Sequence, residues 1–302
     1  MRLQQLLVVL DPTQEAQPAL NRAAWLARHS QAHLDLLLCE FTPALEGALW
    51  LDSTRLEQAR SDLLTQRRAW AEQLAAPLRA EGLDVSVEVR WGKSVQQTVL
   101  DRVAERQPDL VFKASKNHGL LQRLFLSNSC WQLIRKCPVP LWLVHRAEWQ
   151  GHKLAAALDP MHVADKPAAL DHQLIRTGQE LAASLGLEAH YLHCYAPLPR
   201  TLVFDAELIA DYEGYAQRCA QQHRQAFEQL LAPYALQAHQ QHLLEGFAEE
   251  RIPQFVEQSG IDLLLMGAVS RSHLDRALLG NTAERILEAV HCDLLVLKPS
   301  QT

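Results

Sequence analysis

The second half of the chain repeats the first, and this repeat constrains the fold more than any other feature of the sequence. Similar residues recur without a gap at a constant separation of 153 positions, as between Asp109 and Asp262. The other pairs in this register are Leu121 and Leu274, Arg123 and Arg276, Asn128 and Asn281, Ser129 and Thr282, and Leu141 and Leu294. We therefore expect two domains with one fold, over residues 1–148 and 149–302.

Each half alternates apolar, strand-like segments with amphipathic, helix-like segments. The strand-like segments are 6–10, 34–41, 85–90, one from 109 and one near 141, and then 154–158, 187–195, 238–244, one from 262 and one near 294. The helix-like segments are 16–28, 53–80, 95–105 and one near 128, and then 166–183, 206–231, 248–257 and one near 281. Apolar strands separated by helices favour a parallel sheet covered on both faces. The sequence therefore predicts an α/β fold with two tandem, doubly wound, five-stranded parallel-sheet domains.

In such sheets ligands bind at the carboxyl ends of the strands, where the strand order reverses. Asp11 and Asp159 follow the first strand of each half, and the loops at 114–127 and 267–280 follow the fourth. These are the places where we expect a site. The segment that joins the halves, 145–152, is short and polar, so we expect the domains to pack closely.

The loop after the fourth strand of the second half has the spacing of a phosphate loop. Gly267 and Ser270 are followed by nine residues and then by Gly280, Asn281 and Thr282. Glycine lets the backbone approach a phosphate, and the amides at the start of the next helix attract anions. In this loop the chain resembles the universal stress protein family, whose ATP-binding members carry G-x-x-G, nine residues and G-[ST].

The resemblance implies an adenine nucleotide alpha hydrolase-like fold and a regulatory role in the cytoplasmic stress response. It also implies that the second domain binds ATP or a related nucleotide, with magnesium an open question. The residues carried over to that site are Asp159, Pro160, Cys194, Gly267, Ser270, Arg271, Gly280, Asn281 and Thr282. Two of them depart from the family pattern, because Ser270 replaces a glycine and Asn281 replaces Ser or Thr. Single-domain members pair as homodimers, so the resemblance implies an intramolecular pseudo-dimer and leaves a homodimer of the whole chain open.

The first half has lost the glycine motif. Its equivalent positions hold Ala114, Asn117 and Ser127. Positive charge comes from Lys113, Lys116 and His118, which we interpret as part of a solvated loop. Asp11 either caps the region of the following helix or touches a ligand.

Apolar side chains are frequent after the second strand of each half. They are Phe41, Leu45, Leu49, Trp50 and Leu51, and Tyr195, Leu198, Leu202, Val203, Phe204, Leu208 and Ile209. One hypothesis is a carrier of an apolar or lipid-like ligand. The other is a protein contact, as in an interaction scaffold, which exposed apolar patches mark more often.

The sequence gives little support for a metal site or a catalytic centre. His190 and Cys194 would share one face of a strand and His193 would lie on the other, and His239 and His242 have the same problem. A zinc site built from separated segments stays open, but spacing indicates none. The sequence has no G-x-S-x-G, Walker A or H-E-x-x-H motif, so at most slow ATP hydrolysis is expected.

Composition limits the partners and the compartment. A net charge of −6 argues against a nucleic-acid partner, which needs a concentrated basic surface. The 6 cysteines form no C-x-x-C pair and lie mostly in apolar segments, as is typical of a reducing compartment. The apolar start at 6–10 is too short to span a membrane. We therefore expect a cytoplasmic protein with no membrane partner.

Overall fold

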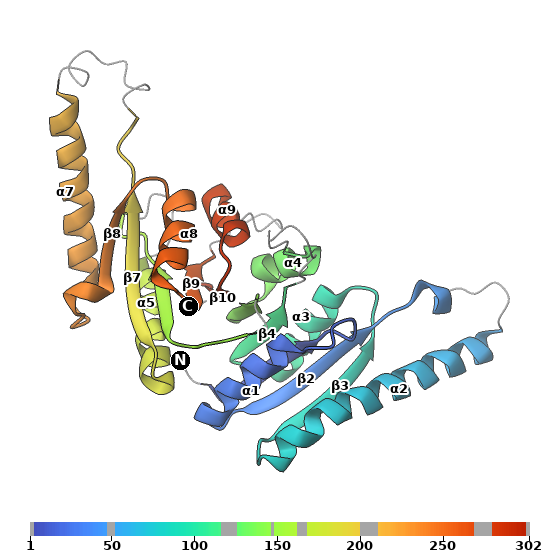
Figure 1. Cartoon of the computed structure of the whole chain (residues 1–302). Helices are drawn as coiled ribbons and strands as arrows, with labels where there is room; N and C mark the ends of the chain where they lie inside the picture. The colour runs from blue at the N-terminus through green and yellow to red at the C-terminus, as the bar shows by residue number, and fades with distance from the viewer. Residues whose placement is uncertain are drawn as a thin grey trace. The chain divides into compact units, whose positions relative to one another are not determined.

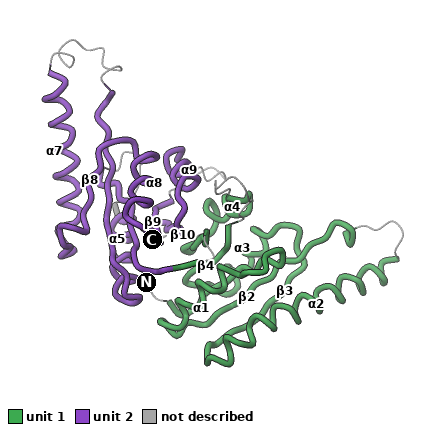
Figure 2. The backbone as a smooth tube through the Cα atoms, viewed as in Figure 1, with its two compact units in different colours: residues 1–119, 125–149 green, residues 120–124, 150–302 purple. Residues whose placement is uncertain are grey.

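A computed structural model describes residues 3–46, 52–115, 126–145, 148–161, 168–199, 211–268 and 280–299. These residues form two compact units, one made by the described residues up to Trp149 and the other by those from Gln150 (Figure 2). Each unit contains parallel strands and its own apolar core.

The first unit alternates strands and helices along the chain (Figure 1). Its elements are β1 (Gln5–Leu10), α1 (Pro18–Ser30), β2 (His33–Glu40), the 3-10 helix η1 (Pro43–Leu45), α2 (Ser53–Ala80), β3 (Val85–Trp91), α3 (Val95–Arg106), β4 (Leu110–Ala114), α4 (Asn128–Lys136) and β5 (Leu141–Val144). The strand order is β3-β2-β1-β4-β5, and every neighbouring pair is parallel.

The second unit has the same order of elements. They are β6 (Lys153–Ala157), α5 (Ala168–Leu185), β7 (Glu188–Tyr195), α7 (Tyr212–Leu231), the 3-10 helix η3 (Ala238–Gln240), β8 (Gln241–Glu245), α8 (Ala248–Ser259), β9 (Leu263–Gly267), α9 (Asn281–Ala289) and β10 (Asp293–Leu297). The order β8-β7-β6-β9-β10 is again parallel throughout. The expected α/β fold with two five-stranded parallel sheets is therefore confirmed.

Right-handed crossovers place α1 and α2 on one face of the first sheet and α3 and α4 on the other. The side chains agree with this arrangement. Trp142 of β5 stacks on Phe112 of β4 and meets Trp149, which also contacts Trp25 of α1. In both units the helix that follows the second strand packs against the edge strand: α2 against β3 and α7 against β8 (Figure 1).

One expected strand begins later than its apolar pattern indicated. Residues 238–240 form a 3-10 turn, and β8 starts at Gln241. The amide of Gln237 donates to the side chain of Gln240 at 2.9 Å, and this local bond holds the turn. The strand is shorter because side-chain bonds to nearby backbone compete with the sheet ladder.

Candidate functional site

The candidate site lies at the carboxyl edge of the second sheet. Because β6 pairs with both β7 and β9, the ends of these three strands lie next to one another. Asp159 and Pro160 follow β6, Cys194 lies near the end of β7, and Gly267 ends β9. The order of the strands reverses between β6 and β9, as ligand sites of this fold class require.

The helix that follows this edge begins without a side-chain cap. Gly280 is the N-cap residue of α9, with φ −67° and ψ 141°, a conformation open to any residue. The glycine is therefore not required by the backbone, and its effect is to leave the first-turn amides uncovered. Asn281 and Thr282, which carry the first two of these amides, are exposed. Uncapped amides at a helix start form an anion site.

The corresponding helix of the first unit is capped. Ser127 stands 153 positions before Gly280, and its Oγ accepts a hydrogen bond from the amide of Cys130 at 3.3 Å. The two units therefore differ in the first-turn amides that an anion would contact: a serine hydroxyl covers one of them in α4, and no side chain caps those of α9.

The two aspartates that follow the first strands also differ. Asp11 accepts hydrogen bonds from the amide of Thr13 at 3.0 Å and from its Oγ1 at 2.6 Å, so it holds a turn and does not cap α1, whose N-cap is Gln17. The Asp159 amide donates to Asp171 Oδ1 at 3.1 Å, while no described residue donates a hydrogen bond to the Asp159 carboxylate. That carboxylate is available to a ligand.

Cys194 carries a protonated thiol and is not a nucleophile. Burial raises the pKa of its thiol to about 12, although the positive charge of Arg251 opposes the shift. The thiol therefore stays protonated near neutral pH, and a protonated thiol behaves as a small hydrophobe. Ser270 and Arg271, the other two predicted contacts of this loop, lie outside the described residues.

Residues on β7 alternate between the two faces of the sheet, as the sequence indicated. His190 meets Phe255 of α8, whereas His193 stacks on His223 of α7. Among the described residues, no three His, Cys, Asp or Glu side chains are placed to hold a metal ion. No helix in the described ranges is long and apolar enough to cross a membrane.

A row of aromatic rings beside Asp159 was missed by the sequence argument. Phe227, His193, His223 and Tyr195 follow one another with centroid separations of 5.9, 5.0 and 5.3 Å. Burial lowers the pKa of both histidines, while the charge of Asp159 raises it. The sequence held no local signal for this row, because His223 comes from α7, far along the chain from β7.

The first unit contradicts the interpretation of Lys113 as part of a solvated loop. The residue lies inside β4, between β1 and β5, and is only 7% exposed. Its burial follows from the central position of β4, which depends on pairing with strands distant in the sequence. Lys116 and His118 lie outside the described residues.

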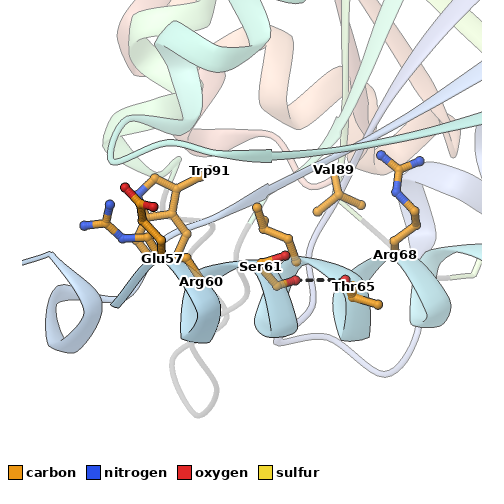
Figure 3. A pocket seen from close by; sticks show the side chains of 8 residues that line it. Glu57, Arg60, Ser61, Thr65, Arg68, Val89 and Trp91 are labelled. Carbon is orange, nitrogen blue, oxygen red and sulfur yellow. Dashed lines mark hydrogen bonds between the residues drawn. The ribbon is translucent and has the colours of Figure 1, made fainter. Parts of the chain in front are cut away.

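A groove of about 460 Å³ runs between α2 and β3 of the first unit (Figure 3). Its floor is formed by Leu64, Val89 and Trp91, and its polar rim by Glu57, Arg60, Ser61, Thr65 and Arg68. Trp91 lies 5.5 Å from the ring of Phe41, and Arg60 donates to the carbonyl of Leu45 at 2.7 Å. Two of the apolar residues singled out in the sequence, Phe41 and Leu45, therefore adjoin the groove, while 49–51 lie outside the described residues.

Comparison with known proteins agrees with the repeat and the fold. The sequence profile of the universal stress protein family matches residues 3–145 and again 158–298. The chain is 29% identical over 300 residues to universal stress protein E of Escherichia coli K12, covering 99% of this chain and 95% of the relative. It is 26% identical over 307 residues to a universal stress protein E homolog of Haemophilus influenzae, covering 100% and 99%.

A solved structure has the same fold over almost the whole chain. It is a protein of unknown function from Pseudomonas aeruginosa PAO1, with a TM-score of 0.77 and 27% identity, covering 98% of this chain and 93% of that one. Both copies of the repeat thus match one family. The chain belongs to the universal stress protein family and carries two of its domains in tandem.

Proposed function

We propose that the second unit binds ATP or a related nucleotide and that the first unit does not. The observation that carries this proposal is the uncapped start of α9 at Gly280, the helix that follows β9 along the chain. A phosphate would accept hydrogen bonds from the amides of Asn281 and Thr282, and the helix dipole would add to the attraction.

The remaining contacts follow from the same edge of the sheet. The Asp159 carboxylate would accept hydrogen bonds from the ribose or the base, and Cys194 would contact the base as an apolar group. Pro160 follows Asp159 in the chain, and Gly267 ends β9. A magnesium ion bound with the nucleotide would find a hydroxyl at Thr282. No nucleophile and base are placed for catalysis among the described residues of this site, so slow hydrolysis is the most that we assign.

The wider role that we propose is regulation of a stress response in the cytoplasm. We place the junction of the two domains at residues 148 and 149, and we propose that they pair as an intramolecular pseudo-dimer. A nucleic-acid partner is not part of this proposal, because the net charge is −6.

Native mass spectrometry of the purified chain tests the ligand, and titration calorimetry tests the site. The proposal predicts that ATP binds the wild-type chain and that Gly280→Val weakens binding at least tenfold, because a branched side chain covers the first-turn amides. Asp159→Asn should also weaken binding, whereas Asp11→Asn, the matched change in the first unit, should not. An absence of heat with wild type, or equal losses from both asparagine variants, would refute it.

A second candidate function is an interaction scaffold or a carrier of an apolar or lipid-like ligand. The groove between α2 and β3 favours this function. Leu64, Val89 and Trp91 form the apolar floor of the groove, and its volume of about 460 Å³ suits a small ligand (Figure 3). The same mass spectrum separates the two functions, since a carrier would retain an apolar molecule in place of a nucleotide. Leu64→Asp should then abolish that retention.

A further inference from the structure

Lys113 is a buried cation without a carboxylate partner among the described residues. Its Nζ donates one hydrogen bond, to the carbonyl of Ala114 at 3.1 Å. A partly buried arginine of the same unit is placed differently, because Arg102 forms two hydrogen bonds to Asp35, at 2.7 and 2.8 Å. Asp35 thus neutralises Arg102, whereas no described carboxylate pairs with Lys113.

An ammonium group has three donors, and burying it costs several kcal/mol unless it is paired. Lys113 uses one donor on a neutral carbonyl and forms no ion pair with a described residue. Long cationic side chains in a core are usually directed toward a charge or toward water. Lys113 is therefore directed toward a negative partner or toward water, and no described residue of the protein supplies a negative partner.

Lys113 lies at a position where this fold class binds ligands. β4 pairs with β1 on one side and β5 on the other, and the order of the strands reverses between β1 and β4. Lys113 is one residue from the carboxyl end of β4, at the edge where this fold class binds ligands.

A second buried polar pair lies just beyond it. Ser115 follows β4 and His145 follows β5, and Ser115 Oγ lies 3.0 Å from His145 Nδ1. Both residues are buried, and Ser115 is two positions from Lys113, so the extended backbone directs their side chains to the same face. The single proton of the Ser115 hydroxyl goes to the carbonyl of Val144 at 3.3 Å, so of this pair only an imidazole can donate to an oxyanion.

The second unit shows that the fold does not require this lysine. Met266 is the residue 153 positions later, and it lies buried at the same place on β9. The start of α4 cannot explain the lysine either, because Ser127 already caps that helix. The charge is thus specific to the first unit.

We infer that the carboxyl end of β4 in the first unit binds a tetrahedral oxyanion, either free phosphate or the phosphoryl group of a larger molecule, through Lys113. A lysine suits phosphate as a point charge, whereas planar carboxylates favour the fork of an arginine. This site is separate from the nucleotide site proposed in the second unit and does not depend on it.

The test measures thermal unfolding with rising inorganic phosphate, at an ionic strength held constant with chloride. The protein carries Gly280→Val, so that α9 does not contribute. We expect the unfolding midpoint to rise by about 2–4 °C at tenfold excess of phosphate over its Kd. Lys113→Met, which copies the second unit, should unfold at a higher temperature without phosphate and should show no rise with it.

Two controls complete the experiment. Lys113→Arg keeps the charge and should keep a rise with phosphate, which covers the case in which Lys113→Met does not fold. Glycerol 3-phosphate in place of inorganic phosphate distinguishes the sources, since a larger rise identifies a phosphoryl group on a larger molecule. Equal rises in the parent and in Lys113→Met, or no rise in the parent, would overturn the inference. Binding of ATP to the wild-type chain is measured separately, so failure of one proposal leaves the other intact.

Discussion

His193 Nε2 lies 2.8 Å from Nδ1 of His223, while Nδ1 of His193 lies 3.2 Å from the carbonyl of Leu158. A carbonyl only accepts, so His193 carries its proton on Nδ1. In the neutral ring Nε2 is then an acceptor, and His223 must donate from Nδ1. The pair is a directed chain of hydrogen bonds that ends at His223 Nε2, and the charge of Asp159 acts on both rings.

Removing the donor of His223 should destabilise the second unit. His223→Phe keeps the stacking on His193 and Tyr195 but leaves the buried Nε2 of His193 without a partner, at a cost of about 1–3 kcal/mol. His223→Asn places an amide N–H at the same distance from Cβ as Nδ1, so it should cost less. Urea unfolding measures both variants, and equal losses would show that the hydrogen bond is not the cause.

Acid should loosen the edge of the second sheet through His242 of β8. His190 Nδ1 lies 3.1 Å from His242 Nε2, and the ring of Phe255 covers His242 at a centroid separation of 4.6 Å. Burial, together with the charges of His190 and His239, lowers the pKa of His242 to about 4, against the opposing charge of Glu188.

Since this pKa is below the unfolded value of 6.5, the folded state binds the proton less readily than the unfolded state. The stability is therefore fully present above pH 6.5 and is lost as the pH falls toward 4. We expect a loss of about 1–2 kcal/mol, because solvent screens a half-buried ring. His242→Phe should flatten the dependence of unfolding free energy on pH in this range; an unchanged slope would assign it to other groups.

The buried ion pair of the first unit should matter mainly when it is broken. Arg102 holds Asp35 of β2 with two hydrogen bonds, and Ser86 donates a third to the same carboxylate at 3.1 Å. Arg102→Ala leaves that buried carboxylate with only the Ser86 hydrogen bond and a longer ion pair to Arg106 at 3.9 Å, and should cost about 3 kcal/mol in unfolding free energy. The double variant Asp35→Leu and Arg102→Met should cost much less. A double variant as unstable as Arg102→Ala would contradict this account.

Giving α9 the serine cap that α4 has should raise the stability of the protein and lower its affinity for the nucleotide. Gly280→Ser copies Ser127, and a serine N-cap in place of glycine stabilises a helix by a few tenths of a kcal/mol. The hydroxyl would occupy a first-turn amide that the phosphate needs. We expect a small rise in Tm and a fall in nucleotide affinity, measured by thermal unfolding and calorimetry on one preparation. A higher Tm with unchanged affinity would show that the serine cap and the phosphate do not compete for the same amide.

The sequence predicted the repeat and the parallel sheets because buried strands and amphipathic helices leave local patterns. The Leu263–Gly267 and Asp293–Leu297 strands, for example, are continuous apolar segments. It also predicted that His190 and His193 face opposite ways, since that alternation is a property of any strand.

What the sequence could not predict depends on contacts between distant segments. Lys113 is buried because β1 and β5 flank its strand, and nothing in residues 110–114 encodes that pairing. The contact of His193 with His223 likewise depends on where α7 packs. The different caps at Ser127 and Gly280 were present in the sequence, but the hydrogen bond of Ser127 became visible only in the structure.

Calorimetric titration of the whole chain with ATP tests the central claim most directly, because the claim is that the two domains differ. The account predicts one nucleotide bound per chain, with affinity at least tenfold lower in Gly280→Val and unchanged in Ser127→Val, the matched change in the first unit. Two nucleotides per chain, or an undiminished affinity in Gly280→Val, would contradict it.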